Sequence, residues 1–126
     1  MDIGNKYISP DRNREPFFDG MESQSAEFSF LCGSCNKEMS FEVWEFLDIA
    51  DEWSDKLSKE ELTNIKKLLN LPKPHEFYTA HDGNQPYLAV LKCPECNHLH
   101  LVYIGFGEIQ PQRYCGTLQG VYEAVT

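Results

Sequence analysis

Two separate stretches of the chain have patterns typical of β-strands: in the first, apolar and polar residues alternate, and the second is rich in apolar and β-favouring residues. The first stretch covers residues 28–31 and 39–43, and the second covers residues 87–91 and 99–106. In each stretch two strand-like runs flank a short segment with turn residues. We therefore expect two β-hairpins of similar layout, followed by one or two further short strands.

Between the two predicted hairpins the pattern takes a helical period. Over residues 43–57 the apolar side chains fall on a single stripe of a helix, and they are Phe46, Ile49, Ala50, Trp53 and Leu57. A second helix should begin after Ser58, because Ser58 and Glu61 have the spacing of a capping box. It should end near Asn70, since Pro72 cannot continue a helix.

The first 27 residues are polar and contain two prolines. They show neither the alternation of a strand nor the helical period of apolar residues. We interpret residues 1–27 as an extended N-terminal arm and residues 28–126 as one domain, with a helical insertion at residues 44–70. A chain of 126 residues has the size of a single domain, and 41% hydrophobic residues are enough for a core. The predicted fold class is α+β.

Each predicted hairpin carries a Cys-x-x-Cys pair at its tip, Cys32 and Cys35 in the first, Cys93 and Cys96 in the second. Four thiolates are the ligand set of a closed tetrahedral zinc site. An asparagine follows each second cysteine, and asparagine tolerates the left-handed conformation that tight turns commonly need. The pattern predicts one structural Zn²⁺ held by the four cysteines.

These two turns resemble the knuckles of the zinc-ribbon families, in which Cys-x-x-Cys or Cys-Pro-x-Cys turns clamp one zinc between two hairpins. The resemblance covers roughly residues 28–43 and 87–106, and Cys93-Pro94-Glu95-Cys96 is the closer match. It implies antiparallel, zinc-ribbon-like hairpins around a site of four cysteine ligands. The gap between the knuckles exceeds the roughly 15–20 residues of the simple motif, and the helical insertion accounts for the difference.

Other uses of paired cysteines stay open. A thioredoxin-like redox motif needs a strand-to-helix turn, whereas both pairs here lie between strand-like runs, so structural zinc is favoured. A disulfide, or a mononuclear iron held by four thiolates, also fits the sequence. A four-thiolate site has no open coordination position, so it would hold the fold without activating water.

Two histidines and the fifth cysteine are further candidates for chemistry. His98 and His100 share a face of a predicted strand, a pattern compatible with a second metal site or an acid–base pair. No serine, cysteine or carboxylate stands at a motif spacing from them, so we interpret them as side chains flanking the knuckle. Cys115 is interpreted as a small buried core residue. We expect no enzymatic activity.

The charge of the chain restricts its partners. Twenty Asp and Glu against eleven Lys and Arg give a formal net charge of −9. Such a chain is unsuited to wrapping phosphates or resting on anionic lipid, so we expect a basic protein partner, no direct nucleic acid and no membrane. The sequence shows no signal-peptide pattern and no apolar run long enough to span a bilayer, so we expect a cytoplasmic location.

The acidic residues concentrate on the first predicted helix, on the side away from its apolar stripe, with Trp44 among them. One interpretation is a solvated helix face with Trp44 tucked against the preceding strand. The other is a recognition surface on which carboxylates steer a basic partner and the aromatic ring anchors it. The candidate contact residues are Trp44, Glu45, Asp48, Asp51, Glu52 and Asp55.

In size, charge and lack of a catalytic constellation, the chain is similar to the bacterial immunity proteins. Those proteins neutralise nuclease or other toxin domains with cationic clefts, so the similarity implies an inhibitor that occludes a basic toxin domain. The alternative is a zinc-ribbon adaptor or a nucleic-acid-associated protein of transcription or translation. That alternative needs a basic face, whereas Lys and Arg are scattered along this chain.

Overall fold

The computed structural model describes residues 2–8 and 16–125, which form strands and helices of an α+β protein. Both predicted hairpins and both predicted helices are present. The elements, in chain order, are β1 (Asp2–Ile8), β2 (Phe18–Met21), β3 (Glu27–Leu31), β4 (Glu38–Glu42), α1 (Val43–Asp55), α2 (Lys59–Leu68), β5 (Gln85–Lys92), β6 (Leu99–Gln110) and β7 (Arg113–Val125).

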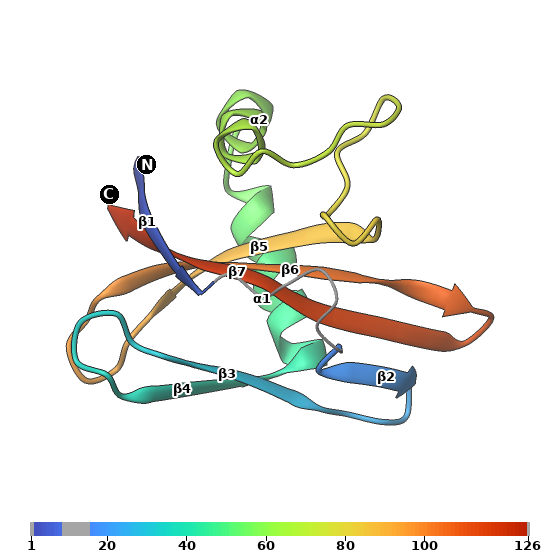
Figure 1. Cartoon of the computed structure of the whole chain (residues 1–126), viewed down its shortest axis with the longest axis horizontal. Helices are drawn as coiled ribbons and strands as arrows, with labels where there is room; N and C mark the ends of the chain where they lie inside the picture. The colour runs from blue at the N-terminus through green and yellow to red at the C-terminus, as the bar shows by residue number, and fades with distance from the viewer. Residues whose placement is uncertain (1, 9–15, 126) are drawn as a thin grey trace.

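The strands form two antiparallel sheets (Figure 1). The larger sheet has the order β1-β7-β6-β5, and β2 also pairs with β7. Residues 113–116 of β7 pair with β2, whereas residues 121–125 pair with β1. These two strands lie in the segment that the sequence marked as an extended arm. The smaller sheet is the β3–β4 hairpin alone.

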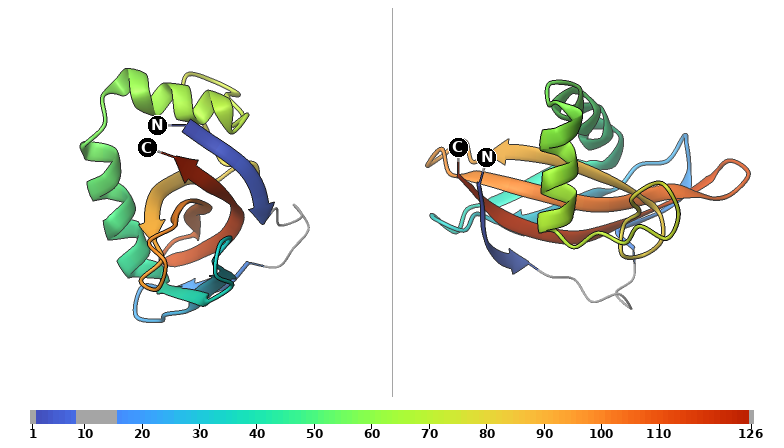
Figure 2. Two further views of the ribbon diagram at one scale, coloured as in Figure 1. Left: turned by 90° about the vertical axis from the view of Figure 1, so that its left-hand side faces the viewer. Right: turned by 90° about the horizontal axis from the view of Figure 1, so that it is seen from above.

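Figure 2 shows how these elements surround the core. The larger sheet curves, the β3–β4 hairpin lies across its concave side, and α1 runs along the flank. Helix α2 lies beyond α1, close to the two chain ends. Neither helix in the described residues has the length and apolar character required to cross a membrane.

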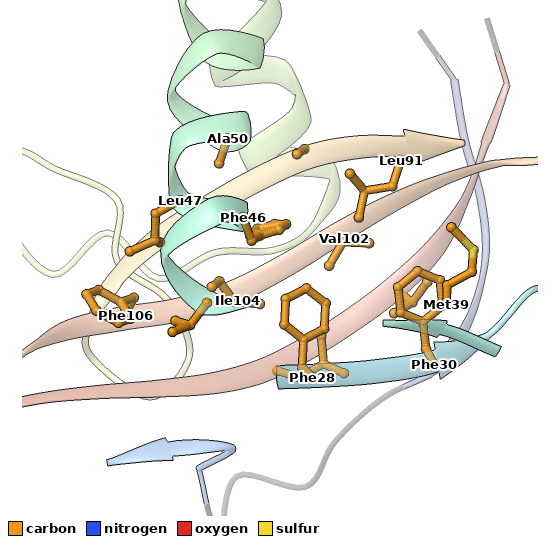
Figure 3. Close-up of a cluster of buried hydrophobic side chains, with 14 of the residues drawn as sticks. Phe28, Phe30, Met39, Phe46, Leu47, Ala50, Leu91, Val102, Ile104 and Phe106 are labelled. Carbon is orange, nitrogen blue, oxygen red and sulfur yellow. The ribbon is translucent and has the colours of Figure 1, made fainter. Parts of the chain in front are cut away.

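The main hydrophobic core fills the space between the larger sheet, the β3–β4 hairpin and α1 (Figure 3). Phe28 of β3 meets Phe46 of α1 edge to face, with ring centroids 5.2 Å apart. Such pairs add to the stabilisation from buried area, which is about 25 cal/mol per Å² of apolar surface. The other labelled side chains of this cluster are Phe30, Met39, Leu47, Ala50, Leu91, Val102, Ile104 and Phe106.

A second core lies on the opposite face of the larger sheet, under α2 and residues 71–80. Strand β6 contributes to both cores, because Val102 and Ile104 face the first while Leu101 and Tyr103 face the second. A strand buried on both faces has a near-continuous apolar run. This accounts for the unbroken hydrophobic stretch within β6.

Candidate metal centre

The turn between β3 and β4 brings Cys32 and Cys35 together. The backbone N–H of Cys32 donates to the carbonyl of Lys37 (2.8 Å), and that of Asn36 donates to the carbonyl of Cys32 (3.0 Å). Asn36 has a φ of 62°, in the left-handed region. The chain therefore reverses direction within a few residues and enters β4.

The turn between β5 and β6 repeats this geometry. The N–H of Cys93 donates to the carbonyl of His98, and that of Asn97 donates to the carbonyl of Cys93, both at 2.9 Å. Asn97 has a φ of 64°. The prediction that the asparagine after each cysteine pair adopts a left-handed conformation is confirmed in both turns.

The four cysteines of the two turns form one group, here called the cysteine cluster. Their sulfur atoms all lie within 4.8 Å of one another. The shortest distances cross between the turns: 3.5 Å from Cys32 Sγ to Cys96 Sγ, and 3.7 Å from Cys35 Sγ to Cys93 Sγ. A tetrahedral site with zinc–sulfur bonds of about 2.3 Å has sulfur–sulfur distances of about 3.8 Å. The cluster can therefore hold one metal ion.

Within the cluster, Cys32 and Cys93 are buried while Cys35 and Cys96 are exposed. All four are free thiols, and the cross-turn sulfur distances exceed the roughly 2.05 Å of a disulfide. In the structure, then, neither cross-turn pair is a disulfide.

The cysteine thiols influence one another's ionisation. Burial opposes ionisation of Cys32, but backbone N–H groups of Cys35 and Ser34 outweigh it and lower the pKa of Cys32 to about 6. The backbone N–H of Lys37 favours the thiolate of Cys35, but partial desolvation and the neighbouring thiols outweigh it and raise the pKa of Cys35 to about 12. Thiolates this close repel one another, and a bound cation relieves that repulsion.

His100 ties the first knuckle to the larger sheet. Its imidazole is fully buried on β6. Nε2 accepts a hydrogen bond from the backbone N–H of Gly33 (3.2 Å), and Nδ1 donates to the carbonyl of Leu91 (3.3 Å). These partners assign a neutral ring with its proton on Nδ1. His100 is thus a structural neighbour of the cysteine cluster.

The remaining residues near the knuckles also connect parts of the chain. His98 stacks edge to face on His100, with ring centroids 4.9 Å apart, and neither histidine belongs to the cysteine cluster. Lys37 and Glu95, one from each knuckle, form an exposed ion pair at 2.9 Å.

Cys115 lies on β7 outside the cluster and is partly buried, and burial raises the pKa of its thiol.

A second candidate surface, here called the acidic face, lies on α1. Its five carboxylates are exposed, and the buried residues of the helix occupy the opposite side. Among the described residues the ion pairs are Lys37–Glu95 and Asp19–Arg113, neither of which involves α1. The carboxylates of the acidic face are Glu45, Asp48, Asp51, Glu52 and Asp55.

Trp44, which the sequence places among these carboxylates, is partly buried and packs against the body of the protein. Its indole N–H donates to the carbonyl of Gln24 (2.9 Å). Its ring meets three others edge to face, with centroid distances of 5.3–5.7 Å, and these belong to Phe18, Phe106 and Tyr114. The ring therefore fixes the first turn of α1 to β2, β6 and β7.

Sequence reasoning missed the residue that begins α1. Glu42 is the N-cap, and its carboxylate accepts hydrogen bonds from the N–H groups of Trp44 (2.9 Å) and Glu45 (3.1 Å). The Ser25 hydroxyl also donates to it (2.8 Å). Burial opposes ionisation of Glu42, but these hydrogen bonds together keep its pKa below the ordinary value. The only sequence signal was its place before the first helical residue.

Comparisons with protein-family models, with curated proteins and with solved structures find no match to this chain. The cysteine cluster and the acidic face are therefore interpreted from their own geometry and chemistry.

Proposed function

We propose that the protein is a non-catalytic module that neutralises a basic protein partner, as an immunity protein does when it blocks a bacterial toxin nuclease domain. The observation that carries this proposal is the acidic face, whose five exposed carboxylates lie on one helix outside the described ion pairs. A nuclease domain binds nucleic acid with a cationic cleft, which such a face complements. Occlusion of that cleft is the inhibitory step.

Electrostatic complementarity would act first on the rate of encounter. Like-charged side chains on one helix produce a local potential that attracts a cationic surface and raises the association rate. The carboxylates of the acidic face stay hydrated until the partner arrives, because none of the described ion pairs engages them.

Rigid support of α1 would add to affinity. Trp44 holds its first turn, Glu42 caps it, and Phe46 is fully buried beneath it. A helix already fixed in its binding geometry loses little conformational entropy when a partner docks.

The cysteine cluster is assigned to one structural Zn²⁺ on a zinc-ribbon-like pair of knuckles. Sulfur distances near those of a tetrahedral thiolate site support this assignment. Cys32, Cys35, Cys93 and Cys96 would hold the ion, which supplies cross-linking of the two hairpins and no catalysis, because four thiolates leave no open position.

A salt-titrated binding assay tests the function. The probes are purified basic toxin nuclease domains and a double-stranded DNA. The variant Asp48→Asn/Glu52→Gln/Asp55→Asn should bind its toxin domain at least about tenfold more weakly, with a flatter salt dependence, because three steering charges are gone.

A matched control carries the same change of net charge elsewhere. Glu22→Gln/Glu27→Gln/Glu38→Gln removes three exposed carboxylates outside α1 and should keep full affinity. An equal loss in this control would contradict a role for the acidic face. Tight DNA binding that survives the α1 substitutions would overturn the inhibitor proposal and favour a nucleic-acid-associated role.

A further inference from the structure

A pocket separate from both candidate surfaces opens beside α2. The segment of residues 70–84 leaves α2, turns back and leads into β5 (Figure 1). Together with α2 and the first residues of β5 it lines an open pocket of about 540 Å³. Small-molecule sites commonly have volumes of about 300–1,000 Å³. The pocket is therefore large enough for a small organic ligand.

Two lysines line this pocket, next to the same tyrosine ring, although the chain as a whole is acidic. The ammonium groups of Lys66 and Lys73 lie 5.8 Å and 5.1 Å from the ring centroid of Tyr78. Among the described ion pairs, neither lysine has a carboxylate partner. Lys66 is partly buried, and burial lowers its pKa, so an anion that entered the pocket would stabilise its charged form.

The pocket also presents aromatic surface. Phe77 lines it and is 78% exposed, so most of its ring faces water. Beside it lies Tyr78, which is already engaged by the lysines. A flat ligand ring can cover Phe77 and remove its apolar surface from water.

Two further polar groups restrict the ligand. Thr63 lines the pocket, and a threonine hydroxyl can donate a hydrogen bond to an anion. The carboxylate of Glu76 also lines it, so the pocket has two cations and one anion. That balance favours a ligand with one phosphate group over a polyphosphate.

We propose that this pocket binds a small organic anion that joins one phosphate group to an aromatic ring, the chemistry of a nucleoside monophosphate. The phosphate contacts the ammonium groups of Lys66 and Lys73, and the base covers the ring of Phe77. This site depends neither on the acidic face nor on the metal.

Calorimetric or NMR titration of the metal-loaded protein with the four common nucleoside monophosphates tests the proposal, with inorganic phosphate and adenosine as partial ligands. At least one monophosphate should saturate the site and bind about tenfold more tightly than either partial ligand. Lys66→Gln and Lys73→Gln should each weaken that binding about tenfold. Phe77→Ala should weaken monophosphate binding and leave inorganic phosphate unaffected.

Lys67→Gln is the matched control, because Lys67 is the exposed neighbour of Lys66 on α2 and does not line the pocket. It should bind like the unsubstituted protein. Absence of saturable binding by all four monophosphates would overturn the proposal. Equal losses in Lys66→Gln and Lys67→Gln, or inorganic phosphate binding as tightly as the monophosphates, would also overturn it.

Discussion

Asn36 and Asn97 occupy the most demanding backbone positions of the knuckles. Their φ angles of 62° and 64° lie in the left-handed region, which costs residues with a Cβ about 1–2 kcal/mol, and asparagine and glycine less. Both positions could be predicted from the sequence, because a tight turn commonly needs a left-handed residue and an asparagine follows each Cys-x-x-Cys pair.

This conformational demand gives a prediction. Asn97→Ala should lower the free energy of unfolding by about 1 kcal/mol, because alanine is strained at a φ of 64°. Asn97→Gly should change it little, since glycine adopts positive φ freely. Denaturant unfolding of the metal-loaded proteins measures both differences.

Asn64→Ala serves as the comparison, because Asn64 is exposed on α2, where alanine is a better helix former. The Asn64→Ala substitution should leave the free energy of unfolding unchanged or raise it slightly. If Asn97→Gly lowers the free energy of unfolding as much as Asn97→Ala does, the cost comes from loss of the asparagine side chain. The explanation by backbone strain would then be wrong.

The surroundings of single side chains were beyond sequence reasoning. The helical period placed Trp44 on the polar side of α1, yet its ring packs on Phe18, Phe106 and Tyr114 from three strands. Periodicity gives the direction of a side chain relative to its own helix. It carries no information on which distant strand covers that side.

At the level of elements, the two helices begin differently. Helix α2 has the capping box of Ser58 and Glu61 that the sequence predicted. Helix α1 begins with Glu42, and glutamate is outside the usual set of N-cap residues. Its carboxylate nevertheless accepts two backbone N–H groups at the helix start.

Replacing this cap should have a pH-dependent effect. Glu42→Ala should cost about 1 kcal/mol of stability at pH 7. Because the folded pKa of Glu42 is lowered, its contribution is present above the ordinary value of 4.5 and is lost as pH falls through the folded pKa. Stability curves of both proteins between neutral and acid pH measure the difference.

Asp48→Ala is the control for Glu42→Ala, since Asp48 is an exposed acid of α1 that lies beyond its first turn. Its effect on stability should be small. A cost for Glu42→Ala that stays constant into acid would show that the ionised carboxylate is not the stabilising form.

The hairpins and helices could be predicted because the recurrence of apolar residues within each one is a local feature of the sequence. Strand β7, in contrast, was not recognised at its full length. Tyr103 pairs with Gly120 and Ile104 with Leu118, so Gln119 is an extra residue in a bulge. A bulge shifts the following side chains to the other face of the sheet, which interrupts the alternation of apolar and polar residues. Much of this strand is also buried on both faces, so little alternation is present to begin with. Its pairing with β1 and β2 leaves no local signal either.

For the whole molecule, the cysteine cluster joins parts of the chain that share no strand pairing. The β3–β4 hairpin pairs with no strand of the larger sheet in the described residues. The cluster connects its tip to the tip of β5–β6, alongside the shared hydrophobic core. A metal bound there would close a long loop and so disfavour the unfolded chain.

Elemental analysis should accordingly find about one zinc per chain, and Cys93→Ser should lose both the zinc and the cooperative fold. Cys115→Ser is the matched control, because Cys115 lies outside the cluster, and it should retain the metal. Circular dichroism and thermal unfolding report the fold. A fully folded Cys93→Ser protein would refute a structural role, and iron in place of zinc would correct the assignment of the ion.

The pairing of β1 with β7 bears on how the chain is made. Residues 2–8 are synthesised before their partners, residues 121–125, from which most of the described chain separates them. Strands β5 and β6 of the larger sheet can therefore pair before β7 exists, whereas β1 must wait for β7. Exposed strand edges of this kind invite pairing with other chains. Nascent chains paused before β7 would be the form of this protein most in need of a chaperone.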